Sequence, residues 1–228
     1  MSEYAYDQAI LRGFGALEFS GQRTSDGGWF GCHNPDINEV AGEIGLPNIS
    51  TMTRAQIEAY ANVDNATAGH PSRPFYGLEE FLEKYGSTHT LLLDPKNAIS
   101  FNSEFMDICE DHVDKDRLIW KYYLGGVGSS TPTNAAQSAI DRGWAATWGY
   151  CYAEDVDSGA FAEHSDNDAW TLLGLNIGAS QLYWDTVLAV GKPVVGHIAN
   201  SQADYDTAIT KGADLVQCST LLSGGLGG

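Results

Sequence analysis

Residues 16–34 hold the densest set of side chains that could do chemistry. Glu18 and Ser20 are two positions apart in a short apolar run, so an extended strand would present both on one face. Asp26-Gly27 is a strong turn signal, and the chain behind it would return His33 towards the end of the strand that carries Glu18. A carboxylate and an imidazole placed in this way can bind a cation and move a proton. A surface carboxylate and a solvated histidine would give the same pattern.

A second acid and a base follow another apolar run. Asp94 ends the run 90–93, and Lys96 comes two residues later. In a barrel of parallel strands, the carboxyl ends of the strands converge on one mouth, so Glu18, Asp94, His33 and Lys96 could meet there. Two carboxylates suit Mg²⁺ or Ca²⁺, the Lys96 ammonium would neutralise a phosphate, and His33 would move a proton. The alternative for both carboxylates is that they only cap neighbouring helices.

Three further residues are candidates for substrate binding. Lys121 lies within a strand-like segment, where a buried ammonium is costly unless paired, so it either faces the site or extends to the rim. Trp148 lies near a predicted strand end and either packs or faces a sugar or glycerol. His197 also ends a predicted strand, and it either lines the mouth or is a core histidine with its hydrogen bonds satisfied.

The elements that must position these residues alternate between short β-rich runs and longer helical stretches. This alternation predicts an α/β fold in which helices wrap a parallel sheet. Because the chain opens with a helix, we expect a TIM-type (β/α)8 barrel that lacks its first strand. A partner chain or an upstream segment would then cover the open seam. The predicted strands are 16–20, 89–94, 117–123, 145–150, 171–176, 193–198 and 214–218, and the predicted helices are 4–12, 54–62, 77–85, 103–112, 134–142, 181–190 and 203–211.

Composition limits the possible functions. The 228 residues fit one barrel domain over 1–221 with a Gly-rich tail at 222–228. The net charge of −18 argues against nucleic acid as a partner, and a phosphate ligand would need a cation to reverse the local potential. We expect no membrane span. The first residues lack the pattern of a secretory signal, so a cytoplasmic or virion-associated location is expected. The four scattered cysteines indicate buried free thiols.

Together these motifs resemble the glycerophosphodiester phosphodiesterases, in which Glu-x-Asp, Thr-x-Asp-Gly and His-Asp follow one another and a Glu-x-Lys strand end comes later. The resemblance runs in the same order from about residue 4 to residue 219, which a single motif would not justify. The matching segments are 18–20, 24–27, 33–34, 78–82, 94–96, 191–195 and 211–216.

The resemblance implies a phosphodiester hydrolase with one divalent cation, Mg²⁺ or Ca²⁺, and two histidines as acid and base. By resemblance, Glu18 and Asp94 are metal ligands, Ser20 stands at the position of the second metal carboxylate, His33 is one of the two histidines, and Lys96 contacts phosphate. The sequence departs from the family in three ways. The opening His-Arg-Gly is absent, Ser20 replaces a carboxylate, and Asp94 is shorter than the usual Glu.

Two hypotheses follow from these matches and departures. The first is a metal-dependent hydrolase of small or polymeric glycerol phosphodiesters, such as a wall teichoic acid, that is completed by an upstream segment or a partner strand. The second is a non-catalytic binding or structural module, for example in a phage tail that contacts a phosphate-containing cell wall. An unrelated barrel enzyme is the remaining alternative.

Overall fold

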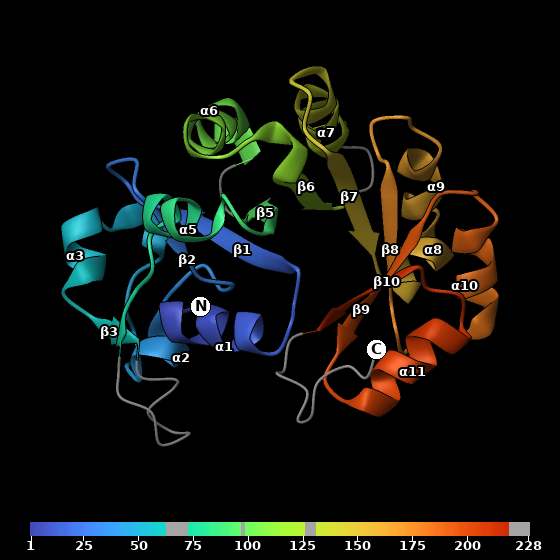
Figure 1. Cartoon of the computed structure of the whole chain (residues 1–228), viewed down its shortest axis with the longest axis horizontal. Helices are drawn as coiled ribbons and strands as arrows, with labels where there is room; N and C mark the ends of the chain where they lie inside the picture. Colours follow the sequence, from blue (N-terminus) through green and yellow to red (C-terminus); the bar gives the residue numbers. More distant parts are fainter. Residues whose placement is uncertain (63–72, 97–98, 126–130, 219–228) are drawn as a thin grey trace. The chain divides into compact units, whose positions relative to one another are not determined.

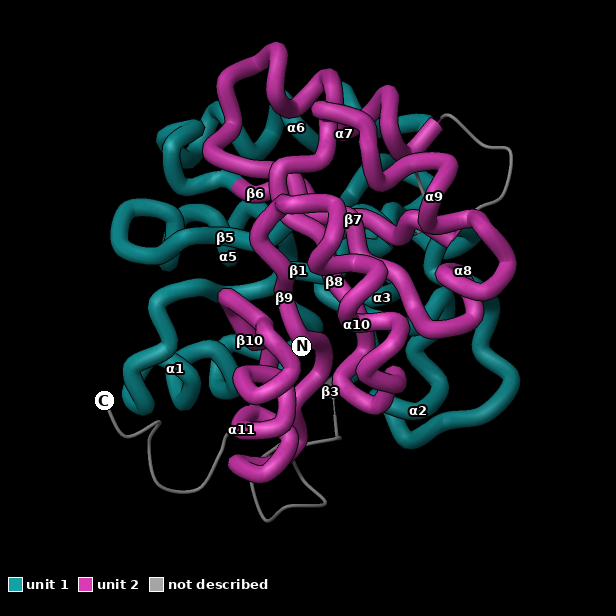
Figure 2. Tube along the Cα trace, turned by 90° about the vertical axis from the view of Figure 1, so that its right-hand side faces the viewer, with its two compact units in different colours: residues 1–118 teal, residues 119–228 magenta. Residues whose placement is uncertain are grey.

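The computed structural model describes residues 1–62, 73–96, 99–125 and 131–218. The chain forms two compact units, Met1–Leu118 and Ile119–Gly228, which Figure 2 distinguishes by colour. Each unit combines parallel strands with helices that follow them in the chain. Among the described residues, no helix combines the length and apolar character that crossing a membrane would need. The barrel domain over 1–221 stays a prediction, and the tail 222–228 lies outside the described residues.

The first unit is built around three strands in the order β5-β1-β2 (Figure 1). Strand β1 (Ala16–Arg23) pairs in parallel with β5 (Thr90–Pro95) and, at its end, antiparallel with β2 (Trp29–Gly31). A separate ladder joins β3 (Ala61–Asn62) to β4 (Arg73–Pro74). The α-helices of this unit are α1 (Glu3–Leu11), α2 (Asn38–Ala41), α3 (Arg54–Glu58), α5 (Leu78–Tyr85) and α6 (Asn102–His112), and the 3₁₀ helices are η1 (Ile49–Thr51), η2 (Ile99–Phe101) and η3 (Lys115–Arg117).

Alternation along β1 separates an apolar face from a polar one. Leu17 and Phe19 are buried, and the Phe19 ring lies 5.1 Å from that of Phe81 on α5. Helix α5 presents its buried side chains at positions i, i+3, i+4 and i+7, which form one stripe. The apolar face of β1 therefore packs against a helix, and Glu18 and Ser20 are left on the opposite face.

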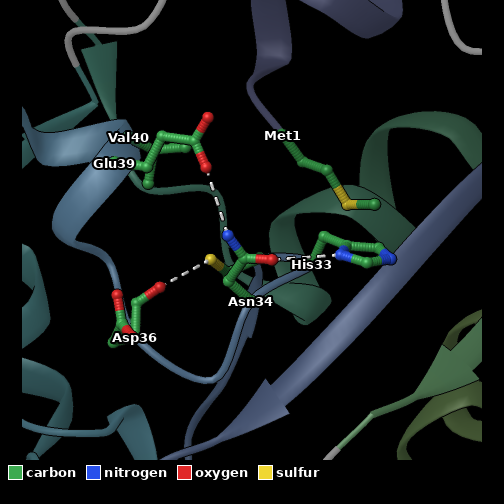
Figure 3. Close-up of a pocket in the computed structure, with 7 residues that line it drawn as sticks. Met1, His33, Asn34, Asp36, Glu39 and Val40 are labelled. Carbon is green, nitrogen blue, oxygen red and sulfur yellow. Dashed lines mark hydrogen bonds between the residues drawn. The ribbon is translucent and has the colours of Figure 1, made fainter.

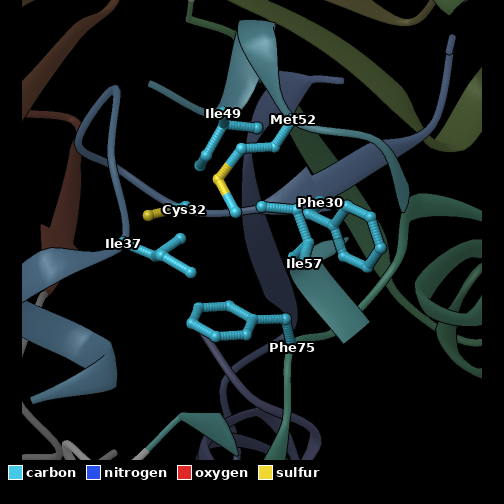
Figure 4. Packing of buried hydrophobic residues seen from close by; sticks show 7 residues of the cluster. All are labelled: Phe30, Cys32, Ile37, Ile49, Met52, Ile57 and Phe75. Carbon is cyan, nitrogen blue, oxygen red and sulfur yellow. The ribbon is translucent and has the colours of Figure 1, made fainter. Parts of the chain in front are cut away.

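A second apolar cluster supports the segment that connects β1 to α5. It gathers around β2 and the loops that follow it (Figure 4). Cys32 belongs to this cluster, and its burial anchors the chain immediately before His33. The buried members are Phe30, Cys32, Ile37, Ile49, Met52, Ile57 and Phe75.

The edge of β1 that faces away from β5 is covered by groups of the same chain. The Tyr6 hydroxyl donates to the Glu18 carbonyl at 2.8 Å. The Ser20 N–H donates to Met1 Sδ at 3.3 Å, and the Ser20 carbonyl accepts from Cys32 N–H at 2.9 Å. Side chains and a hairpin thus take the place of a neighbouring strand at these positions. A partner chain over the seam stays a prediction.

The second unit contains five parallel strands in the order β10-β9-β8-β7-β6. Helix α11 packs on β9 and β10, α10 packs on β8, and α7 packs on β7, as Figure 1 shows. The strands are β6 (Leu118–Tyr123), β7 (Ala146–Cys151), β8 (Leu172–Asn176), β9 (Val194–Ala199) and β10 (Leu215–Cys218). The helices are α7 (Thr131–Asp141), α8 (Ala153–Ser158), α9 (Ala160–Ser165), α10 (Gln181–Leu188) and α11 (Gln202–Thr210).

All seven predicted strands are present, but the predicted helix 54–62 is wrong in its second half. Thr53 caps the helix in a capping box with Gln56, as its sequence suggests. The helix then ends at Glu58, and Ala61–Asn62 forms β3 instead. A prediction from local propensity cannot foresee that this segment pairs with Arg73–Pro74, and this pairing competes with the helix.

Candidate functional site

The first part of the site is an acidic pair on the polar face of two neighbouring strands. Ser20 on β1 is in register with Asp94 on β5, and Glu18 is in register with Leu92. Register neighbours in a parallel pair point to the same face, so Glu18, Ser20 and Asp94 share one face near the carboxyl ends of both strands. The Ser20 hydroxyl donates to Glu18 Oε1 at 3.1 Å. The structure therefore brings together the three residues that the sequence placed at a metal site.

Lys96 neutralises the buried acid of this group. Its Nζ lies 2.7 Å from Asp94 Oδ2, and the two side chains are 16% and 1% exposed. The Lys96 backbone N–H donates to the Gly21 carbonyl at 2.9 Å, which anchors the residue to the end of β1. A buried carboxylate needs such a partner, and the ammonium that supplies it is itself partially exposed.

His33 is exposed, and its ring is oriented by two neighbouring residues (Figure 3). Its Nδ1 lies 3.2 Å from Asn34 Oδ1, while Asn34 Nδ2 donates to Glu39 Oε2 at 3.2 Å. Because the Asn34 oxygen can only accept, Nδ1 must carry the proton, and Nε2 of the neutral ring is the acceptor. Asn34 and Glu39 thus hold the imidazole in the tautomer that a general base at Nε2 requires.

A cavity of about 240 Å³ lies beside this imidazole. Gln22, on the same face as Glu18 and Ser20, donates from Nε2 to the His33 carbonyl at 3.2 Å and joins β1 to the cavity. The period of two along β1 could have indicated Gln22, whereas no sequence signal indicated Glu39. The cavity is lined by Met1, Cys32, His33, Asn34, Asp36, Glu39 and Val40 (Figure 3).

In the second unit, Lys121 and Trp148 are register neighbours on one face of the sheet. Lys121 is 4% exposed, and its Nζ lies 4.7 Å from the Trp148 ring centroid and 5.0 Å from that of Tyr150. Contacts of this kind stabilise a desolvated ammonium. The Lys121 side chain therefore lies buried over one face of the sheet and does not extend to solvent at a rim. Trp148 is buried and packs beneath the ammonium without offering an open stacking face.

His197 is both buried and part of a cavity wall. Its Nε2 lies 2.9 Å from the Cys151 carbonyl, which can only accept, so Nε2 carries a proton. The ring also lies edge-on to those of Tyr150 and Tyr152 at 5.5 and 5.3 Å. It lines a cavity of about 470 Å³ at the carboxyl end of β9. His197 thus has the burial and the hydrogen bond expected of a core histidine, and it also lines a cavity near the end of its strand.

The oxygen donors of the acidic pair fit a hard cation by their chemistry. Glu18 and Asp94 supply carboxylates, and Ser20 supplies a hydroxyl between them. Mg²⁺ is often held by one or two carboxylates, with water and substrate oxygens completing its shell. No cluster of three or more His, Cys, Asp or Glu side chains suited to a metal ion occurs among the described residues.

Similarity to solved structures identifies the fold of the chain. A *Silicibacter pomeroyi* protein assigned as a glycerophosphoryl diester phosphodiesterase matches with a TM-score of 0.77 at 16% identity, over 96% of this chain and 84% of that one. The chain has the glycerophosphodiester phosphodiesterase fold. An *Oleispira antarctica* phosphodiesterase in complex with the product sn-glycerol-3-phosphate matches with a TM-score of 0.72 at 15% identity, over 92% and 83% of the two chains.

A third structure, a glycerophosphodiester phosphodiesterase from *Agrobacterium tumefaciens*, matches with a TM-score of 0.69 at 10% identity, over 96% of this chain and 90% of that one. No protein-family model and no curated protein matches the sequence. These matches confirm the predicted fold class, an α/β barrel of the TIM type without its first strand. At such identities the glycerophosphodiester phosphodiesterase fold is what the matches establish.

Proposed function

We propose that this chain hydrolyses phosphodiesters of the glycerophosphodiester type with the help of one divalent cation. The observation that carries the proposal is the shared face of Glu18, Ser20 and Asp94 on β1 and β5, with Lys96 bound to Asp94 at 2.7 Å. Hydrolysis adds water across one P–O ester bond and gives an alcohol and a phosphomonoester. The site must therefore balance phosphate charge and move protons.

The residues of the first unit divide these tasks. His33 Nε2 accepts the proton of the attacking oxygen as that oxygen forms its new bond to phosphorus. The P–O ester bond to the other alcohol breaks, and the departing oxygen takes up a proton from solvent. The positive charge of the partially exposed Lys96 balances that on a nonbridging phosphate oxygen. Asp94 holds the Lys96 ammonium in position through their ion pair.

Mg²⁺ or Ca²⁺ bound at Glu18 and Asp94, beside the Ser20 hydroxyl, would polarise the phosphate oxygens. Such an ion would also reverse the local potential at the site, where the net charge of −18 otherwise repels an anionic substrate. Lys121 and His197 stay predicted substrate contacts, and Trp148 is proposed to act by supporting Lys121.

The substrate class rests on the fold and on the *Oleispira antarctica* neighbour, whose structure holds sn-glycerol-3-phosphate as product. We propose that the same product chemistry, a phosphomonoester of a small alcohol, applies to this chain. Glycerophosphocholine represents a small substrate, and a poly(glycerol phosphate) such as a wall teichoic acid represents a polymeric one.

The experiment measures release of glycerol phosphate from both substrates with Mg²⁺, Ca²⁺ or EDTA. His33→Ala is expected to lower kcat at least about 100-fold, the usual scale of lost acid–base catalysis, and Glu18→Gln is expected to lower kcat because it removes a carboxylate proposed to bind the cation. His112→Ala is the matched control, because His112 lies on α6, where its Nδ1 lies 2.9 Å from the Ile108 carbonyl and its Nε2 lies 3.9 Å from Glu83 Oε1 on α5. Equal rates for the parent and both site variants would refute the assignment.

A second candidate is a binding module without catalysis. Two observations favour it. Ser20 offers a hydroxyl where the family has a carboxylate, and the Asp94 carboxylate is already paired with Lys96. This candidate predicts that the phosphodiester binds and is recovered intact, which the same assay detects by mass balance.

A further inference from the structure

A cavity of about 470 Å³ lies at the carboxyl ends of β8 and β9, beside helix α11. It lies wholly within the second unit, and its volume is within the range of roughly 300–1,000 Å³ that is usual for small-molecule sites. Most of its lining residues are polar. The lining residues are Tyr152, Asn176, Ile177, Gly178, His197, Ile198, Asn200, Asp204, Thr207 and Lys211.

One wall of this cavity is a single face of α11 and the residues flanking it. Asn200, Asp204, Thr207 and Lys211 follow each other at spacings of four, three and four, which is the repeat of one helix face. Their side chains end in an amide, a carboxylate, a hydroxyl and an ammonium group, in that order. This wall therefore supplies both donors and acceptors to the cavity.

Lys211 fixes the opposite wall and keeps donor capacity. Its Nζ donates to the carbonyls of Ile177 and Ala179, both at 2.7 Å. An ammonium has three N–H donors, so within the described residues one donor is left for a ligand. The loop behind β8 is therefore held at a fixed distance from α11.

Asp204 and Asn176 complete the polar set. Asp204 Oδ2 accepts from the Asn200 N–H at 2.9 Å, which leaves Oδ1 as an acceptor. Asn176 Oδ1 accepts from the Ala153 N–H at 3.0 Å, so its Nδ2 is the group available to donate. The cavity thus offers an acceptor from Asp204 and a donor from Lys211 on the α11 wall, and a donor from Asn176 at the end of β8.

Tyr152 adds an aromatic surface. Its side chain is 37% exposed, and its ring is supported by that of His197 at 5.3 Å with the planes at 78°. His197 is itself held by the Cys151 carbonyl. A supported ring next to mixed donors and acceptors suits the C–H face and the hydroxyls of a polyol, since each hydroxyl both donates and accepts.

We propose that this cavity binds a neutral polyhydroxyl group, a sugar or a polyol. The opposite charges of Asp204 and Lys211 favour a ligand without net charge, because a phosphate would be repelled by the carboxylate and a quaternary ammonium by the lysine. This binding does not depend on the proposed hydrolysis, because none of the residues to which its chemical steps are assigned, Glu18, His33, Asp94 and Lys96, lines this cavity.

The test is a titration of the isotope-labelled protein followed by two-dimensional NMR, with methyl glucoside and glycerol as neutral probes and inorganic phosphate and choline as charged ones. Saturable shifts at Asn176, Gly178 and Asn200 are expected with the neutral probes only. Tyr152→Ala should weaken binding about tenfold and Tyr152→Phe about twofold or less. Asp204→Asn should weaken it about fivefold, the scale of one net hydrogen bond.

Asp206→Asn is the matched control, because Asp206 is exposed on α11, bonds to Gln202 and does not line the cavity. Three results would each overturn the proposal. They are no saturable shift with either neutral probe, tighter binding of phosphate or choline, and an equal loss in the Asp206 and Asp204 variants. Since no probe contains a phosphodiester, a chain without hydrolase activity can still give the expected result.

Discussion

Replacing Ser20 by Asp is predicted to make folding depend on a divalent cation. The Ser20 side chain is fully buried, and its Oγ lies 3.1 Å from Glu18 Oε1 and in register with Asp94. An Asp at this position would place a carboxylate about 4 Å from that of Glu18, where two like charges repel by about 4 kcal/mol at an effective dielectric constant of about 20. Proton uptake by one of the pair relieves part of this repulsion.

We therefore expect Ser20→Asp to lower the free energy of unfolding by about 2–4 kcal/mol in EDTA. A cation bound at about 100 times its Kd should restore about 2.7 kcal/mol. The assay is urea unfolding at neutral pH, with EDTA or with Mg²⁺ or Ca²⁺. Ser20→Asn is the control, because it has the same shape without the charge.

Two outcomes would refute this reasoning. One is equal stability of the Asp and Asn variants in EDTA, which would mean that the new carboxylate and that of Glu18 do not repel each other measurably. The other is an equal gain of both variants on adding the cation, which would mean that the ion binds elsewhere.

Three further predictions use the same measurement of unfolding. Lys96→Met should destabilise by about 3 kcal/mol because it leaves the Asp94 carboxylate buried without its ion-pair partner, and adding Asp94→Asn should recover most of the loss. Gly174→Ala should cost about 1–3 kcal/mol and shift the Trp148 indole N–H resonance, since the new Cβ would clash with Trp148 Nε1. Burial raises the pKa of Tyr6 well above its usual value, so its contribution is present below the unfolded pKa of about 10 and is lost as pH rises above it. Tyr6→Phe should therefore be less stable than the parent at pH near 8, and that difference should shrink above pH of about 10.

Each variant has a contrast that isolates the stated cause. Gly178→Ala serves for Gly174, because its added Cβ would meet only Asn176 Nδ2 at 3.8 Å. Lys96→Arg keeps the ion pair and should retain most of the stability. If Gly178→Ala cost as much as Gly174→Ala, close packing against Trp148 would not be the reason. An unchanged difference between the parent and Tyr6→Phe across the alkaline range would exclude the Tyr6 proton as its source.

The sequence was informative wherever a local period decides the structure. The alternation of Leu17, Glu18, Phe19 and Ser20 predicts the two faces of β1, and the structure confirms both of them. The helix over 54–62 was wrong in its second half because the competing partner at Arg73–Pro74 is distant in the chain. Helices α8 and α9 were not predicted, since Gly159, in a left-handed conformation at a φ of 85°, divides a polar stretch into two short pieces.

The sequence indicated candidate residues for the site but not their contacts, and the roles of these residues stay predictions. Strand ends and motif order indicated Glu18, His33, Asp94 and Lys96. The register of Ser20 with Asp94 depends on how two strands far apart in the chain match their buried faces, which sequence spacing does not contain. The tautomer of His33 depends on Glu39, which reaches Asn34 from a different element, α2.

The covered border of β1 has a consequence for association between molecules. An incoming extended peptide gains its affinity from a row of open backbone donors and acceptors. Here a phenol holds the Glu18 carbonyl and a thioether accepts the Ser20 N–H, and neither group can propagate a ladder. Residues 1–6 thus occupy backbone groups at this edge of β1 and disfavour the edge-to-edge strand pairing that builds fibres.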